Sequence, residues 1–238
     1  MKTIRLLQLY PSEMNIYGDW GNTLTLKRRL EWRGYKVELI EHHPGAAFPM
    51  DVDLVTGGGG QDSGQDKIKD DLIKIGPNLH TLANDGVPML MICGLYQLFG
   101  RFFQTHKGEK IEGIGIFKAE TYGGPVRLIG NIVTKSEEFG EIIGYENHSG
   151  LTRLDEDQAS LGTVIKGEGN NGQDGTEGAR YKNVIGSYLH GSLLPKNPRL
   201  ADFLIEKTIE KKYGKVELTK LDDTVVKKSR SIAKDRPR

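Results

Sequence analysis

Short apolar segments alternate with amphipathic ones through the first half of the chain, and this alternation restricts the possible folds more than any other property. Strand patterns occupy residues 3–10, 37–40, 53–56 and 88–92. Helical spacing occupies residues 22–33, 66–84 and 95–103, with Pro77 predicting a break or kink in the second helix. Residues 88–92 are wholly apolar, as expected for a strand buried on both faces. The pattern predicts an α/β fold with a mainly parallel central sheet flanked by helices.

The second half has a different character, because it is rich in Gly and Thr and its strand patterns are short. These patterns lie at residues 126–133, 142–146, 161–165 and 184–189, and they predict a more antiparallel C-terminal portion. Residues 200–213 predict a closing helix that ends at Gly214. We therefore expect one domain over residues 1–214 and a basic C-terminal tail over residues 215–238. The six Lys/Arg and one Asp of residues 227–238 predict a solvated, frayed end.

Charge and cysteine content narrow the class of protein. The 33 basic and 32 acidic residues give a net charge of +1, which predicts neither a nucleic-acid partner nor binding to an acidic membrane surface. A single cysteine can form neither an internal disulfide nor a thiolate metal cluster. The start of the chain lacks the pattern of a signal peptide, and no apolar run reaches membrane-spanning length. We expect a protein of the reducing cytoplasm.

The first candidate for chemistry is Cys93, which follows the buried strand pattern and directly precedes a helical one. A sharp strand-to-helix turn lifts a side chain out of a sheet, as in the nucleophile elbow of hydrolases. The start of a helix favours a thiolate, and its free N–H groups, with that of Gly94, can hold an oxyanion. Free cysteine is also commonly buried as an apolar residue, so position alone leaves both interpretations of Cys93 open.

The second candidate is His190, which stands at the tip of a strand pattern and precedes Gly191. A thiol nucleophile needs a base within hydrogen-bond reach. His190 lies 97 residues after Cys93, so only the fold can bring the two together. Taken alone, His190 has the more ordinary interpretation of an exposed loop histidine.

The third feature is the glycine run at residues 57–60, directly after a strand pattern. Such a loop exposes backbone N–H groups, but no Gly-Lys-Ser/Thr follows, so a P-loop is not predicted. The run could donate a second oxyanion hydrogen bond or form a flexible turn.

Together, the three features resemble class I glutamine amidotransferases. The matching motifs are the strand followed by four glycines, CGxxQLxG from Cys93 to Gly100, and YLHG at residues 188–191. The YLHG form is similar to the branch related to cobyric acid synthase. Within that branch, GGGQD at residues 58–62, ENHSG at residues 146–150, Thr152 and the length of the chain resemble the GatD group, the glutaminase subunits of lipid II isoglutaminyl synthases. The resemblance extends from about Ile4 to Tyr213.

The resemblance implies catalytic roles. Cys93 falls on the nucleophile, His190 on the base and Gly94 on one oxyanion donor. One position departs from the pattern, because many class I enzymes carry a glutamate two residues after the histidine and this chain has Ser192 there. The third catalytic member is therefore missing, is a weak hydroxyl or comes from elsewhere. Asp19, after the first strand, is one candidate that the sequence alone cannot select.

The resemblance also implies substrate contacts. Gln97 falls on a position that contacts substrate, and Gly58 and Gly60 fall on loop positions that contact bound glutamine. Arg127 resembles the glutamine-binding arginine of the GatD group. That role suits its chemistry, because a guanidinium can hold an α-carboxylate with two hydrogen bonds, whereas an ordinary exposed arginine is the alternative.

The implied reaction is hydrolysis of the glutamine side-chain amide, with no metal and no cofactor in this chain. No ATP-binding motif is recognisable, yet making an amide from a carboxylate needs activation, so the ammonia must go to another protein. The GatD group implies a Mur-ligase-like subunit, MurT, which forms a heterodimer and amidates the D-glutamate of lipid II in peptidoglycan synthesis. Two alternatives stay open: supply of ammonia to another acceptor, such as a cobyric-acid-type synthase, or a non-catalytic binding module on the same fold.

Overall fold

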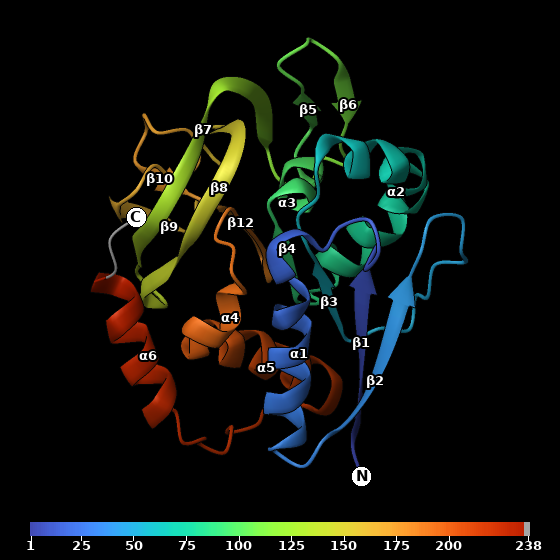
Figure 1. The fold of residues 1–238 in the computed structure, drawn as a ribbon. Coiled ribbons are helices and arrows are strands. Elements are labelled where there is room, and N and C mark those ends of the chain that lie inside the picture. The colour runs from blue at the N-terminus through green and yellow to red at the C-terminus, as the bar shows by residue number, and fades with distance from the viewer. Residues whose placement is uncertain (236–238) are drawn as a thin grey trace.

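The computed structural model describes residues 1–235, which build two sheets (Figure 1). The central sheet has the strand order β11-β12-β4-β3-β1-β2. Its pairs are parallel except at one edge, where β11 runs antiparallel to β12. The strands are β1 (Thr3–Leu9), β2 (Lys36–His42), β3 (Leu54–Gly57), β4 (Met89–Ile92), β11 (Ala179–Tyr181) and β12 (Val184–Ser187). The predicted mainly parallel central sheet is confirmed.

Helices cover both faces of the central sheet. The crossovers through α1 (Trp20–Glu31) and α2 (Asp62–Asn84) run in opposite directions across the sheet. Because such crossovers are right-handed, the two helices lie on opposite faces. The first face also carries α4 (Leu193–Lys196) and α5 (Pro198–Tyr213), and the second carries α3 (Gly94–Phe99) (Figure 1). Every residue of β3 and β4 is buried, as a strand covered on both sides requires.

The second sheet stands over the carboxyl ends of the central strands (Figure 1). Its order is β10-β9-β7-β5-β6, with β8 paired to β7, and all pairs except β5–β7 are antiparallel. The strands are β5 (Phe102–Gln104), β6 (Lys110–Glu112), β7 (Ala119–Ser136), β8 (Gly140–Leu154), β9 (Gly162–Lys166) and β10 (Thr176–Glu177). The antiparallel C-terminal portion is also confirmed, but β7 and β8 are far longer than their sequence patterns indicate.

Two helix predictions need correction. The helix expected at residues 95–103 ends at Phe99, and the chain continues as β5. Gly100 adopts an extended conformation there, and a Cβ at this position would come within 2.8 Å of the carbonyl oxygen of Ala119. Of the break or kink predicted at Pro77, the break is wrong, because α2 continues through this residue. Proline deprives the carbonyl four residues earlier of its partner. That carbonyl belongs to Ile73, whose side chain is 45% exposed, so it lies on the hydrated side of the helix.

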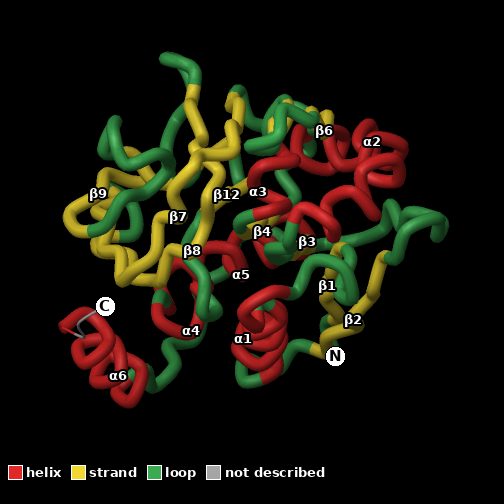
Figure 2. Tube along the Cα trace, turned by 45° about the horizontal axis from the view of Figure 1, so that its top comes forward, coloured by secondary structure: helices red, strands yellow, loops and turns green. Residues whose placement is uncertain are grey.

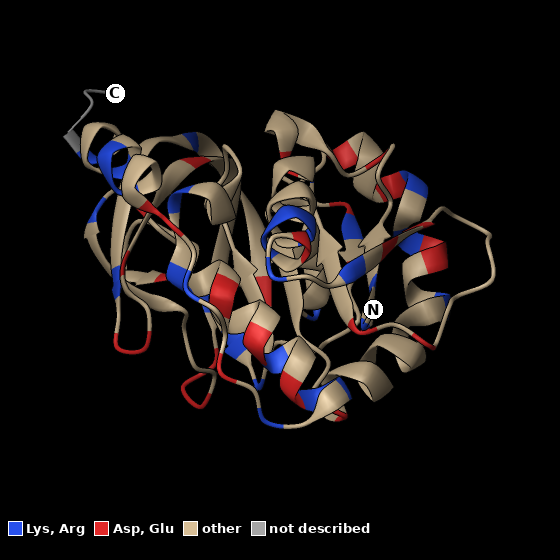
Figure 3. Cartoon of the chain, turned by 90° about the horizontal axis from the view of Figure 1, so that it is seen from below, with Lys and Arg blue, Asp and Glu red and all other residues tan. Residues whose placement is uncertain are grey.

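The basic C-terminal segment is helical rather than frayed between Thr224 and Asp235, which form α6. Figure 2 shows α6 beside α4 and the β7–β8 hairpin. Arg230 fixes it there by donating hydrogen bonds to the carbonyl of Lys196 and to Oδ1 of Asn197, at 2.8 and 2.6 Å. Lysines and arginines gather on this helix (Figure 3). Residues 236–238 of the predicted tail lie outside the described residues. Within residues 1–235, no helix combines the length and the apolar character needed to cross a bilayer.

Candidate active site

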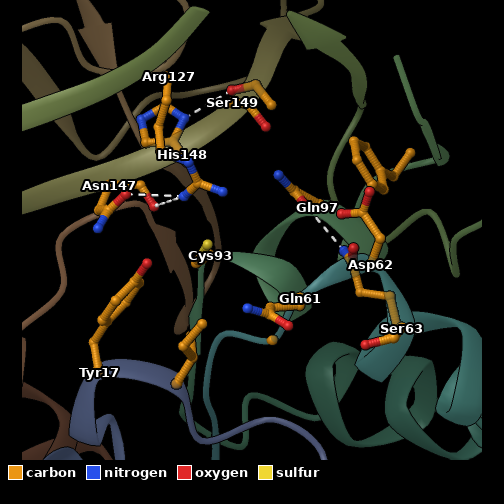
Figure 4. Close-up of a pocket in the computed structure, with 15 residues that line it drawn as sticks. Tyr17, Gln61, Asp62, Ser63, Cys93, Gln97, Arg127, Asn147, His148 and Ser149 are labelled. Atoms are coloured by element: carbon orange, nitrogen blue, oxygen red, sulfur yellow. Dashed lines mark hydrogen bonds between the residues drawn. The ribbon is translucent and has the colours of Figure 1, made fainter. Parts of the chain in front are cut away.

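Cys93 occupies the turn between β4 and α3. Its backbone has φ +49° and ψ −103°, which is a strained conformation for a residue with a side chain. Its N–H donates to the carbonyl of Ser187 on β12 at 2.8 Å, and its carbonyl accepts from Gln97 at 2.9 Å. These bonds hold the turn rigid, and the thiol faces a cavity (Figure 4). In this geometry a mostly buried cysteine stands at the start of a helix and opens onto the cavity.

Two glycine loops meet beside the thiol. A Cβ added at Gly94 would come within 3.0 Å of the backbone nitrogen of Gly60, so the two loops touch. The N–H of Gly94 opens α3 and has no partner within the helix. Met14 packs beneath both loops, because its side chain would meet a Cβ at either glycine within 2.8 Å. The arrangement places backbone donors from two loops beside Cys93, as an oxyanion hole requires.

His190 follows β12, the neighbour of β4. Its N–H donates to the carbonyl of Tyr145 on β8 at 2.8 Å, and its side chain is buried. A Cβ at Gly59 would come within 2.8 Å of the His190 ring and 3.0 Å of Cβ of Cys93, so only glycine fits between the two. Burial by itself lowers the pKa of His190. The negative charges of Cys93 and Asp19 and the hydrogen bond to Asp19 outweigh burial, so the pKa of His190 is raised. His190 therefore holds a proton strongly, as a group that accepts a thiol proton must.

Asp19 supplies a carboxylate to the other side of the imidazole. Its Oδ1 lies 3.3 Å from Nδ1 of His190, and both side chains are almost fully buried. Its Oδ2 accepts the N–H of Gly59 at 2.7 Å. One carboxylate thus orients the imidazole and fixes the glycine loop at the same time. The same contact leaves the second ring nitrogen of His190 to face Cys93.

Ser192, at the position where many class I enzymes carry glutamate, has a different task. Its hydroxyl donates to the carbonyl of Gly18 at 2.8 Å, which ties the His190 loop to the residue before Asp19. A Cβ at Gly21 would lie 2.1 Å from the Ser192 hydroxyl. The short serine and the glycine let the two loops approach closely enough for Asp19 to reach His190.

A cavity of about 340 Å³ opens in front of Cys93. It lies between the glycine loop and α2 on one side and β7 and β8 on the other (Figure 4). Arg127 reaches into it from β7, at a register irregularity between Gly123 and Leu128. Its guanidinium donates to the backbone carbonyl and to Oδ1 of Asn147, at 3.2 and 2.9 Å. An oriented guanidinium above a thiol suits a substrate that carries a carboxylate.

Comparison with known proteins assigns the chain to a family. The model of the CobB/CobQ-like glutamine amidotransferase domain matches residues 5–198. This chain belongs to that family. The resemblance inferred from the cysteine, histidine and glycine motifs is thereby confirmed.

Two curated relatives match this amidotransferase over nearly its whole length. Both are the subunit GatD of a lipid II isoglutaminyl synthase (glutamine-hydrolyzing). The Staphylococcus aureus protein is 37% identical over 99% of this chain and 97% of its own length. The Streptococcus pneumoniae protein is 39% identical over 98% of this chain and 90% of its own length. A cobyric acid synthase from Mesorhizobium japonicum is 30% identical, but the match covers 66% of this chain and 32% of that protein.

Solved structures agree with the fold. A chain of PurLQS from Thermotoga maritima superposes with a TM-score of 0.59 at 15% identity, covering 86% of this amidotransferase and 98% of that chain. A glutamine amidotransferase crystal structure gives a TM-score of 0.58 at 15% identity, covering 85% and 98%.

Gln97 lines the cavity and belongs to a buried polar chain. Its Oε1 accepts from Gln65 at 2.8 Å, and its Nε2 donates to the hydroxyl of Tyr188 at 3.1 Å. That hydroxyl also contacts the hydroxyl of Thr152 at 2.6 Å. These bonds fix the orientation of the Gln97 amide and leave one of its N–H groups for a ligand.

Glu177 lies in the core and supports the end of β12, the strand that leads to His190. It is fully buried and accepts hydrogen bonds from the N–H of Tyr188 and the hydroxyl of Ser187, at 2.7 and 3.1 Å. Burial raises the pKa of Glu177 to about 8, although these two bonds oppose the shift. The side chain is therefore mostly a neutral acid at pH 7.

The structure brings most of the predicted site residues to one cavity, but not all of them. Cys93, Gln97, Gly60 and Arg127 line it. His190 and Gly94 lie directly behind Cys93, as described above. Gly58 does not line the cavity, because it packs behind the loop, where a Cβ would come within 2.3 Å of the carbonyl oxygen of Met14 and 2.9 Å of Asp19.

Sequence reasoning missed several residues of the cavity wall, Tyr17 and Asn147 among them. Tyr17 has φ +57° and sets its ring edge-on against the imidazole of His190, with 5.0 Å between ring centroids. Nothing in the sequence marks this tyrosine. A left-handed backbone conformation is unusual for a bulky side chain, so it would not be predicted at Tyr17. Asn147 orients Arg127. Its place in the ENHSG motif indicated that Asn147 has a functional role, but the motif did not indicate that this role is to orient Arg127.

The histidine of the ENHSG motif lines the cavity and is held in place by buried contacts. His148 stacks on the ring of Tyr188 at 3.6 Å, and its Nδ1 hydrogen-bonds the carbonyl of Gly150 at 2.7 Å. Burial lowers the pKa of His148 to about 3, so it is neutral at pH 7. In the part of the chain that the structure describes, no group of three or more His, Cys, Asp or Glu side chains is placed to hold a metal ion.

Proposed function

We propose that this chain is the glutamine-hydrolysing subunit of a lipid II isoglutaminyl synthase. The observation that carries the proposal is the meeting of Cys93, His190 and Asp19 at a cavity that also holds Arg127. Support for the acceptor comes from the two GatD relatives, which match the chain almost from end to end.

The mechanism starts from the Cys93–His190 pair. The imidazole takes the thiol proton, and the thiolate attacks the side-chain amide carbon of glutamine. The backbone N–H groups of the two glycine loops hold the oxyanion of the tetrahedral intermediate. His190 then protonates the leaving nitrogen, so that ammonia departs and a γ-glutamyl thioester of Cys93 remains. A water molecule, deprotonated by His190, attacks the thioester, and glutamate leaves as the thiol is restored.

The ammonia requires an acceptor that has been activated elsewhere. The sequence contains no Gly-Lys-Ser/Thr phosphate loop. We propose that a Mur-ligase-like subunit, MurT, forms a heterodimer with this chain in the cytoplasm. It would use ATP to activate the α-carboxyl of D-glutamate in the lipid II stem peptide. Ammonia released at Cys93 would then form the amide.

The test uses the complex purified after co-expression with the Mur-ligase-like subunit. Wild-type complex should release glutamate and amidate lipid II with glutamine as nitrogen source. Cys93→Ala should abolish both activities with glutamine and retain amidation when ammonium is supplied. Glutamine hydrolysis by Cys93→Ala at the wild-type rate would refute the proposed nucleophile. Glutamate release without lipid II amidation would point to another acceptor.

A further inference from the structure

The cavity in front of Cys93 contains two fixed charges of opposite sign. Among the described residues that line it, Arg127 is the fixed cation and Asp62 is the carboxylate. His148 adds no charge, because burial lowers its pKa to about 3. Figure 4 shows Arg127 and Asp62 entering from opposite walls, with Gln97 between them. A ligand in this cavity therefore meets a positive group on one side and a negative group on the other.

Asp62 is available for such a ligand. It is the first residue of α2, its side chain is exposed, and no hydrogen bond or ion pair joins its carboxylate to another side chain within residues 1–235. Asp66, one turn later, is different, because it pairs with Lys69 at 2.5 Å. A carboxylate at a helix start is favoured by the helix dipole. The helix dipole explains why a carboxylate stands at the start of α2. It does not explain why this carboxylate lines the same cavity as Cys93 and Arg127.

We propose that Asp62 binds the α-ammonium group of the substrate and so restricts the site to free α-amino acids. The inference rests on the proposed hydrolysis of glutamine. Glutamine carries its ammonium and carboxylate on one carbon, so groups on two walls can bind them together. With Arg127 on the carboxylate and Asp62 on the ammonium, the side-chain amide extends toward Cys93.

This assignment gives the site a selectivity that Arg127 alone does not provide. An N-acylated glutamine whose α-carboxylate is free, such as N-acetylglutamine or a glutamine at the C-terminus of a peptide, can bind Arg127 but has no ammonium to offer Asp62. If such a compound bound, the carboxylate of Asp62 would have no ammonium group to contact. The site would therefore reject N-acylated glutamine even where its carboxylate is free to bind Arg127.

The experiment compares two substrates in the wild-type complex and its variants. Glutamine carries the ammonium, whereas 4-carbamoylbutanoate has the same chain and amide without it. Asp62→Asn should lower kcat/KM for glutamine by roughly 10- to 100-fold, the range for losing a charged hydrogen bond. It should change kcat/KM for 4-carbamoylbutanoate by less than about 2-fold. Asp62→Glu should restore part of the preference for glutamine. Asp66→Asn is the matched control on the same helix and should leave both values unchanged.

The outcomes separate this inference from the proposed function. Hydrolysis of glutamine by the wild type, with an unchanged ratio of the two kcat/KM values in Asp62→Asn, would overturn the role of Asp62 alone. An equal loss with both substrates would also overturn it, because a structural defect does not distinguish them. A wild-type complex that hydrolyses no glutamine would overturn the proposed function and this inference with it.

Discussion

Replacement of Asp19 by asparagine tests how the base is oriented, because it changes charge and hydrogen bonding but not shape. In the wild type, Asp19 accepts hydrogen bonds from both Nδ1 of His190 and the N–H of Gly59. The asparagine oxygen can keep the short bond to Gly59. Its NH₂ group then faces the imidazole and donates to Nδ1. That bond favours the tautomer with the proton on the nitrogen that faces Cys93, which can no longer accept the thiol proton.

The size of the effect follows from the bond that is lost. A hydrogen bond to a charged group contributes about 1.5–3 kcal/mol, or roughly 10- to 150-fold in rate. The 3.3 Å contact is long for such a bond and favours the lower part of this range. The His190 tautomer that carries its proton on the nitrogen facing Cys93 lowers kcat further. We expect kcat to fall about 100-fold with KM changed by less than about 2-fold, because Asp19 lies behind His190 and does not line the cavity.

The assay is glutamate release by the complex over a range of pH. Asp19 raises the pKa of His190, so its loss lowers that pKa, and the alkaline limb of kcat/KM should move to lower pH. Amidation with ammonium should be unaffected. Asp19→Ala is less informative, because it also leaves the buried N–H of Gly59 without a partner. Unchanged kcat and an unchanged alkaline limb in Asp19→Asn would refute the orienting role.

Three further predictions concern other parts of the site. His190→Ala should lower kcat at least about 100-fold with little change in glutamine affinity, measured by calorimetry; poor affinity with normal turnover would indicate a binding role. Arg127→Ala should lower kcat/KM for glutamine by roughly 100-fold and Arg127→Lys should recover only part of it, whereas an equal loss with ammonium as nitrogen source would assign Arg127 to folding or the subunit interface. Glu177 binds a proton in the folded state that the unfolded chain has released, because its pKa is raised from 4.5 to about 8. The free energy of unfolding should therefore fall as pH rises from about 5 to 8, and Glu177→Gln should flatten this slope in urea titrations at each pH; equal slopes would show that Glu177 does not titrate as proposed.

The sequence was most informative where a local pattern and a chemical group coincide. An apolar strand that ends at Cys93 before a helix predicts the turn, because burial on both faces and the helix start are both local properties. The same reasoning placed His190 at a strand end. In a parallel sheet, such ends meet at one edge, which is why residues 97 apart in the chain share a site.

Features that depend on distant contacts could not be read in this way. Asp19 reaches His190 across 171 positions, and only the close approach of Gly21 and Ser192 permits it. The length of β7 was underestimated because Gly123, Gly124 and Pro125 interrupt the strand pattern just before residue 126. The helix at the C-terminus was missed for a similar reason, since Arg230 bonds to backbone and side-chain oxygens of the α4 end that no local pattern reveals.

The link between Asp19 and His190 also has a consequence for synthesis of the protein. The orienting carboxylate leaves the ribosome early, whereas the imidazole that it orients emerges when most of the chain has been made. Until β12 inserts beside β4, the Cys93 turn lacks the carbonyl of Ser187 and the thiol has no base. A nascent chain that ends before β12 lacks both the fixed Cys93 turn and His190, so we expect efficient glutamine hydrolysis only once β12 is in place.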